Sequence, residues 1–136
     1  MKDLSASLVE LYDKMSSWEA GVVKDTGLTL PQMHCVEALG AYGPLRMKDL
    51  AARLGVTMGT LTVMVDRLSD QGLMERKPNE EDGRSFWLSL TPSGEKLHQE
   101  HHRHHETLAE EITAGFSQTE KATLHALLQR VNQAFH

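Results

Sequence analysis

The stretch from Arg46 to Thr91 constrains the fold most, because two helix patterns, a glycine turn and two strand patterns follow one another there. Residues 47–54 place apolar side chains at helical spacing, and a Gly-Val pair then interrupts them. Thr57 is a suitable N-cap for a second helix, which is expected to end at Gly72. Two helices joined by such a short turn form a helix-turn-helix. The side chains predicted to face inward are Met47, Leu50, Ala51, Leu54, Leu61, Met64, Val65 and Leu68.

A hairpin is predicted directly after the second helix. Residues 73–77 and 85–90 read as strands, and the segment 78–83 between them is rich in turn-forming residues. In the second strand, the two-residue alternation places Phe86, Leu88 and Leu90 on one face. A hairpin in this position is a wing, so we expect a two-stranded wing and no strand elsewhere in the chain.

The second helix and the hairpin together resemble the MarR family of bacterial transcription regulators. The resemblance covers residues 28 to 98 and implies a winged helix-turn-helix that inserts its second helix into a DNA major groove. It also implies a homodimer formed through the first and last helices. The motifs that carry it are Asp82-x-Arg84, Leu88-x-Leu90-Thr91 and Gly94 in the wing, Thr57 to Thr62, Val65 to Leu68 and Gly72-Leu73 around the second helix, and Leu28-Thr29-Leu30-Pro31-Gln32 upstream.

A long first helix is predicted over residues 3–22. Its apolar side chains repeat about every 3.5 residues, a spacing typical of a helix packed lengthwise on another helix. This stripe faces either the subunit's own core or a second subunit, and the resemblance favours the second subunit. The stripe consists of Leu4, Leu8, Leu11, Met15, Trp18 and Val22.

Three further helices are predicted from their starting signals. Thr29 and Gln32 have the spacing of a capping box, Thr91-Pro92 opens a helix that runs to about Ile112, and residues 117–120 form a second capping box. The last helix carries an apolar stripe of Leu124, Leu127, Leu128, Val131 and Phe135. We therefore expect a mainly α fold.

The domain organisation predicted from these elements is a single domain over residues 1–136. Its winged helix-turn-helix core would occupy residues 28–91, and residues 1–27 and 92–136 would form the helical dimerisation region.

Composition limits where this chain acts and what it binds. It has no signal-peptide pattern or long apolar run, and its single cysteine cannot form an internal disulfide, so a cytoplasmic location without membrane contact is expected. The net charge is −5, yet residues 46–84 hold seven basic and seven acidic groups, so the excess acid lies outside the helix-turn-helix and wing. Binding to nucleic acid depends on this local balance.

The residues expected to contact double-stranded DNA follow from the two reading elements. Side chains near the start of a recognition helix face base edges, and a wing arginine suits a narrow minor groove. Asp82 could orient Arg84 through a charge-assisted hydrogen bond, or the two could form an ordinary solvated salt bridge. In the recognition helix, Val63 stands where the family often has a basic or polar residue. Candidates are Thr57, Met58, Gly59, Thr60, Thr62, Asp82 and Arg84, with Lys48, Arg53 and Lys77 as phosphate contacts or ordinary surface charges.

Histidine is concentrated in the long helix that is predicted to start at Pro92. Five of the eight histidines lie between His98 and His105, and four of them, at 98, 101, 102 and 105, share one helical face. Neutral imidazole is the commonest metal ligand in proteins. The cluster therefore predicts a metal site, with a solvated polar face or a pH-sensing cluster as the alternatives.

The resemblance suggests which residues would hold this metal. Zinc-sensing members of the family take ligands from the helix that starts after Thr29 and from a histidine-rich part of the long helix. Those members also use a cysteine near the end of the first helix, where this chain has none; Cys35, beside His34, is expected to be a buried apolar residue or a redox sensor. The chosen ligands are His34, His101, His105 and Glu100, with Glu19, Asp25, His98 and His102 as further candidates.

Taken together, these features predict a dimeric regulator that binds a pseudo-palindromic DNA operator and responds to Zn²⁺, acting as a repressor of metal-uptake genes. Other divalent transition metals also bind imidazole. The alternative is a MarR-type repressor released by a small phenolic effector, with incidental histidines. A metallohydrolase is disfavoured, because no His-Glu-x-x-His motif is present.

Overall fold

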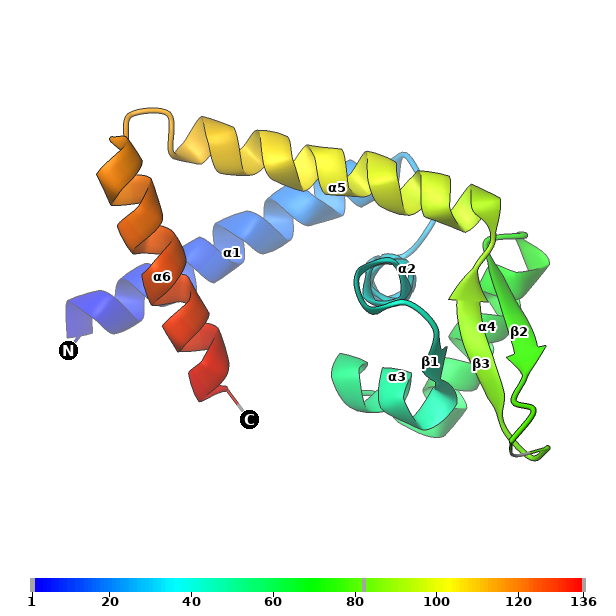
Figure 1. Ribbon diagram of the computed structural model, residues 1–136. Helices are drawn as coiled ribbons and strands as arrows, with labels where there is room; N and C mark the ends of the chain where they lie inside the picture. Colours follow the sequence, from blue (N-terminus) through cyan, green and yellow to red (C-terminus); the bar gives the residue numbers. More distant parts are fainter. Residues whose placement is uncertain (1, 82, 136) are drawn as a thin grey trace. The chain divides into compact units, whose positions relative to one another are not determined.

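The computed structural model describes residues 2–81 and 83–135 and confirms a mainly α fold (Figure 1). It has two compact units, residues 1–101 and 102–136, whose boundary falls within one long helix. None of the helices in the described residues is long and apolar enough to cross a membrane. The elements are α1 (Lys2–Lys24), α2 (Leu30–Tyr42), β1 (Leu45–Arg46), α3 (Met47–Leu54), α4 (Met58–Asp70), β2 (Met74–Pro78), β3 (Phe86–Leu90), α5 (Pro92–Ile112) and α6 (Gln118–Ala134).

Local capping interactions start three of the helices where the sequence predicts. Thr29 and Ser117 each close a full capping box, and the Thr57 side chain accepts a hydrogen bond from the Thr60 backbone N–H at 3.1 Å. Gly55 ends α3 with a φ of +66°, a left-handed conformation that costs little only for glycine. The predicted helix-turn-helix is therefore confirmed, with α4 ending at Asp70 and the predicted cap residue Gly72 in a left-handed conformation, at a φ of +74°.

The sheet confirms the two-stranded wing, formed by β2 and β3, but corrects the prediction that strands occur nowhere else. It has three antiparallel strands in the order β1-β3-β2, because Leu45 and Arg46 pair with Leu88 and Trp87 of the wing. Strand structure is thus not confined to the hairpin. A two-residue strand leaves no periodicity in the sequence, which is why the prediction missed it. Its consequence is that the wing is bonded to the chain just before α3.

The core of residues 1–101 joins the helix-turn-helix to the wing. Helix α4 buries all four predicted side chains, whereas Met47 and Leu54 of α3 are only half-buried. In β3 the predicted face holds for Leu88 and Leu90, but Phe86 is 41% exposed near the wing tip. The fully buried large side chains are Met33, Leu39, Leu50, Leu61, Leu68, Leu88, Val36, Val65 and Cys35. Each buried aliphatic side chain of this size contributes about 1.5–3 kcal/mol to stability.

Helices α1 and α6 both leave apolar side chains in solvent. The first half of the α1 stripe is exposed, with Leu4 at 57% and Leu8 at 51%. Within the second unit, α6 buries no residue, and its stripe includes Val131 at 44% and Phe135 at 78% exposure. Contiguous exposed apolar surface marks interaction sites.

Helices α2 and α5 approach closely at Gly40. A Cβ atom on Gly40 would lie 2.2 Å from the Cγ atom of the His98 ring, whereas Gly21 in α1 has open space around it. The His98 ring therefore packs directly on the α2 backbone, and only glycine fits beneath it.

We predict that Gly40→Ala lowers the free energy of unfolding by about 1–3 kcal/mol, because the added methyl group overpacks this contact. The matched control Gly21→Ala, also in a helix, should leave stability unchanged or raise it by up to about 1 kcal/mol. Urea denaturation followed by circular dichroism measures both. Equal stabilisation by the two substitutions would show that the contact is not tight.

We also predict that Cys35 is unreactive in the folded protein. The side chain is fully buried, and burial raises the pKa of its thiol to about 11, so the thiol stays protonated at pH 8. A disulfide reagent at pH 8 should label the unfolded chain within minutes and the native chain only at the rate of unfolding. Rapid labelling of native protein would instead favour a redox-sensing role.

Candidate functional site

The start of α4 presents the predicted recognition residues to solvent. Thr57, Met58, Gly59, Thr60 and Thr62 are all exposed. The hydroxyl of Thr57 donates to the Thr60 hydroxyl oxygen at 3.0 Å, and that of Thr62 donates to the Met58 carbonyl at 2.8 Å. These local bonds orient the threonine side chains, while their oxygens can still accept further hydrogen bonds.

Asn79 organises the wing loop. Its buried side chain accepts a hydrogen bond from the Glu81 backbone N–H at 3.0 Å and donates to the Ser85 hydroxyl at 3.3 Å. Arg84 follows in this loop and is exposed, as predicted. Asp82, its predicted partner, lies outside the described residues. Arg84 lines one cavity together with Met58 and Thr62 of α4.

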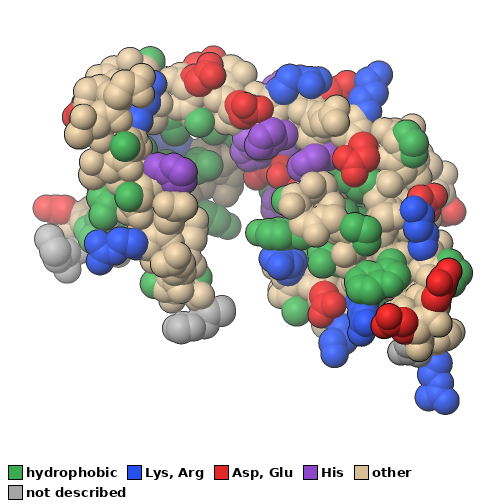
Figure 2. Space-filling view, in the orientation of Figure 1, with side chains coloured by type: hydrophobic (Ala, Val, Ile, Leu, Met, Phe, Trp, Pro, Cys, Tyr) green, Lys and Arg blue, Asp and Glu red, His purple; other side chains and the backbone are tan. Residues whose placement is uncertain are grey.

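A groove of about 510 Å³ lies between the recognition helix and the wing. It is lined by α4, by the chain around the start of α3 and by the end of the wing loop. Figure 2 shows basic and acidic side chains interspersed over this end of the unit. The lining residues are Arg46, Met47, Lys48, Met58, Thr62, Arg84, Ser85 and Phe86. Three cations together with the apolar side chains of Met47, Met58 and Phe86 suit an anionic, partly apolar ligand.

The other predicted phosphate contacts have partners on the protein. The Arg53 guanidinium lies 3.7 Å from the centroid of the Tyr42 ring, and the Lys77 Nζ atom lies 3.5 Å from a carboxylate oxygen of Glu75. Both cations are exposed and outside the groove lining. Lys48 alone among the three predicted phosphate contacts lines the groove, and Arg46 joins it although the sequence did not single it out.

An ion pair connects the recognition helix to the wing. Arg76 of β2 contacts the carboxylate of Asp66 in α4, and its guanidinium also lies 5.9 Å from the centroid of the Phe86 ring. The pair is partly exposed, so its own contribution to stability is small. It nevertheless joins the two elements that flank the groove.

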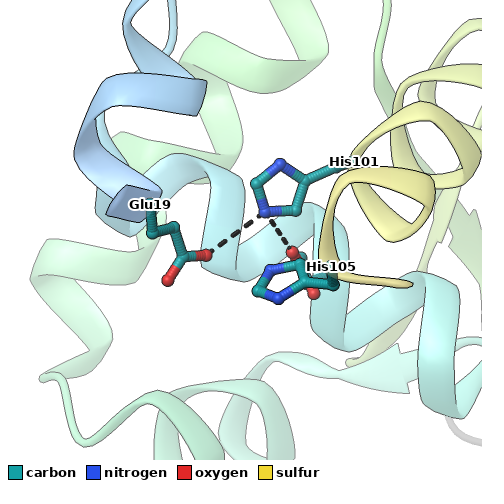
Figure 3. Close-up of side chains that lie close together, drawn as sticks. Glu19, His101 and His105 are labelled. Atoms are coloured by element: carbon teal, nitrogen blue, oxygen red, sulfur yellow. Dashed lines mark hydrogen bonds and ion pairs between the residues drawn. The ribbon is translucent and has the colours of Figure 1, made fainter. Parts of the chain in front are cut away.

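A second group of functional side chains lies where α1, α2 and α5 meet. The His101 ring is buried, and its Nε2 atom lies 3.2 Å from a Glu19 oxygen and 2.6 Å from a Glu37 oxygen. His105 follows one turn later on the same helix (Figure 3). One ligand atom from each of these four residues lies within 4.8 Å of the others, as a shared cation would require.

The structure brings some predicted ligands to this group and leaves others outside it. His34 lies at its edge, with its Nε2 atom 3.7 Å from a Glu19 oxygen and its side chain 45% exposed. Glu100 and Asp25 are exposed elsewhere, and His98 packs on Gly40. His102, a further candidate ligand, is 62% exposed, and its Nε2 atom lies 3.5 Å from a Glu106 carboxylate oxygen.

Glu37 was missed by the sequence analysis. It stands three residues after His34 in α2, so the two side chains share a helical face, and this spacing is a signal that could have identified it. The donor set found, two carboxylates and two imidazoles, is one that Zn²⁺ accepts. Ligand atoms on one tetrahedral Zn²⁺ lie roughly 3.3–3.6 Å apart, given bonds of about 2.0–2.2 Å. On one Zn²⁺, the His101 Nε2 atom and the Glu37 oxygen would move apart from 2.6 Å, and the pairs that are further apart, up to 4.8 Å, would move together.

Comparisons with known proteins identify the family of the helix-turn-helix and the wing. The sequence profile described as "MarR family" matches residues 28–86. MarR of Salmonella typhimurium, a multiple antibiotic resistance protein, is 35% identical over 97 residues, which cover 71% of this chain and 65% of that protein. The transcriptional repressor MdtR of Bacillus subtilis is 32% identical over 95 residues, which cover 70% and 61%. The chain thus spans slightly less than two thirds of these two relatives.

A solved structure extends the likeness over nearly the whole fold. FabT of Streptococcus pneumoniae, crystallised in complex with DNA, superposes with a TM-score of 0.85 at 25% identity, covering 97% of this chain and 94% of FabT. The matched residues 28–86 contain the helix-turn-helix and most of the wing described above. The chain belongs to the MarR family.

Proposed function

We propose that this protein is a homodimeric, DNA-binding transcription regulator whose affinity for its operator is raised by Zn²⁺. The observation that carries the DNA-binding part is the groove that the exposed start of α4 shares with Arg84 of the wing. FabT, which has the same fold, is a DNA-bound protein in its solved structure, and MdtR is a repressor. The proposal makes the chain a cytoplasmic regulator and not an enzyme.

The DNA-reading roles follow from the exposed side chains. The α4 threonines and Met58 would meet base edges in the major groove, where a threonine methyl or Met58 can contact a thymine methyl. Arg84 would enter the adjacent minor groove. Because residues 46–84 carry no net charge, we expect weak non-specific binding and specificity from geometry.

A dimer is required to place two such reading heads on one operator. The exposed apolar stripes of α1 and α6 supply surface that a second copy of the chain would cover. Two recognition helices about 34–36 Å apart would then match half-sites one helical turn apart in a pseudo-palindrome.

The metal part of the proposal rests on the carboxylate–histidine group. Glu19, Glu37, His101 and His105 would hold Zn²⁺ and so link α1, α2 and α5. The opposite face of α2 packs in the core with α3 and β3, so fixing α2 affects the elements that carry the groove. A metal that binds the DNA-competent arrangement more tightly shifts the equilibrium towards it. The regulated genes would then be metal-uptake genes, repressed when the metal is abundant.

We predict that Zn²⁺ raises the affinity for a selected duplex by about 5- to 150-fold, the usual size of an allosteric coupling. The duplex is obtained by selection from a random pool with wild-type protein, and affinity is measured by fluorescence anisotropy with zinc or with a chelator. His101→Ala should abolish most of the zinc effect. His104→Ala, an exposed histidine on the same helix, is the matched control and should retain it.

Two results would contradict the metal part. Equal zinc responses in the His101 and His104 variants would show that the carboxylate–histidine group does not mediate the zinc effect. Full-affinity binding without metal, followed by release when a phenolic acid is added, would favour the alternative effector. Failure to select any duplex would contradict the DNA-binding part itself.

We predict that Val131→Glu weakens the dimer at least tenfold, because it places a charge in the apolar stripe of α6. Gln129→Glu adds the same charge to the same helix away from the stripe and should leave the dimer intact. Sedimentation velocity over a concentration series measures both. If both variants remain dimeric, the subunit interface lies elsewhere.

A further inference from the structure

We propose that Arg46, stacked on Trp87, binds a backbone phosphate of the DNA strand that passes between the recognition helix and the wing. This inference rests on the proposed DNA binding and adds a contact that neither the sequence motifs nor the predicted contact residues contain. Arg46 lies in β1, in the segment that joins α2 to α3, and it lines the groove with Lys48 and Arg84.

Strand pairing fixes where the Arg46 side chain can go. Arg46 is the direct antiparallel partner of Trp87 in the β1–β3 ladder. Its guanidinium carbon lies 5.0 Å from the centroid of the Trp87 ring, within the range of a cation–π interaction. The stacked ring restricts the long side chain before DNA arrives, so less conformational entropy is lost on binding.

The charge of Arg46 is available to a ligand. Among the described residues no carboxylate lies within ion-pair distance of Arg46 or Lys48, whereas Arg76 and Lys77 pair with Asp66 and Glu75. Arg46 is also the N-cap residue of α3 but cannot cap it with its side chain, because an N-cap side chain accepts a hydrogen bond and arginine has only donors.

The groove suits one DNA strand in particular. Its lining combines three cations with exposed apolar surface from Met58 and Phe86, which are 48% and 41% exposed. A nucleic-acid backbone likewise combines anionic phosphates with less polar sugars. Guanidinium matches phosphate oxygens through two parallel N–H···O bonds, which suits Arg46 to this contact.

The test compares the salt dependence of binding for Arg46→Gln and wild type on the selected duplex and on a scrambled duplex. Each subunit of the proposed dimer carries one Arg46, so the substitution removes two phosphate contacts. It should lower the slope of log affinity against log salt by about 1.8 and weaken binding to both duplexes by a similar factor. Arg130→Gln, which removes an exposed charge from α6, is the matched control and should retain the wild-type slope.

Variants at Trp87 separate orientation from charge. Trp87→Phe keeps an aromatic ring under the guanidinium and should bind nearly as wild type, whereas Trp87→Leu should weaken binding with the charge still present. Arg46→Lys should retain the slope but bind less tightly, since lysine lacks the fork of donors. Thermal melting checks that each variant is folded. If Arg46→Gln has lost its native melting transition, Arg46→Met replaces it, because methionine also removes the charge and keeps a long side chain.

The outcomes separate this inference from the proposed function. A wild-type slope in folded Arg46→Gln would overturn the phosphate contact and leave the regulator intact. The inference would also be overturned if Arg46→Gln lost affinity only for duplexes that carry one particular base pair, because Arg46 would then contact a base and not a phosphate. Absence of DNA binding by wild-type protein would refute the proposed function, and the inference with it.

Discussion

Strand β3 fixes the position of the wing relative to the chain that enters α3, because it pairs with β1 on one side and with β2 on the other. Leu88, at the centre of β3, is fully buried, and it is paired with both Leu45 and Arg76. A slip of one residue would turn Leu88 to solvent, so the buried leucine fixes the register. The wing therefore cannot move independently of the chain that enters α3, and the groove between wing and recognition helix has a defined width.

Helix α2 connects the surface formed by α4 and the wing to the carboxylate–histidine group. One side of it packs Met33, Val36 and Leu39 into the core, and the other carries His34 and Glu37 towards Glu19 and His101. Protein cores are close-packed, so a shift of one face of a helix is transmitted to the other. A cation at this group would act on the groove through a single rigid element, without a new contact to DNA.

Local signals in the sequence determined most of what was predicted correctly. Capping at Thr29, Thr57 and Ser117 depends on residues three positions away, and burial of the α4 stripe depends on helical periodicity. What was missed depends on distant contacts. Two residues of β1 form a strand only because β3 lies beside them, and Glu37 meets His101 only because α2 packs against α5. The same limit explains why Arg46, which belongs to no motif, was not among the predicted DNA contacts.

The central claim is that two copies of the helix-and-wing face bind one side of a duplex together. Hydroxyl-radical footprinting of the selected duplex measures this directly. The account predicts protected sugars on one face of the duplex, at two half-sites about one helical turn apart, with additional minor-groove protection where each wing lies. A single protected patch, or protection without helical periodicity, would contradict the account.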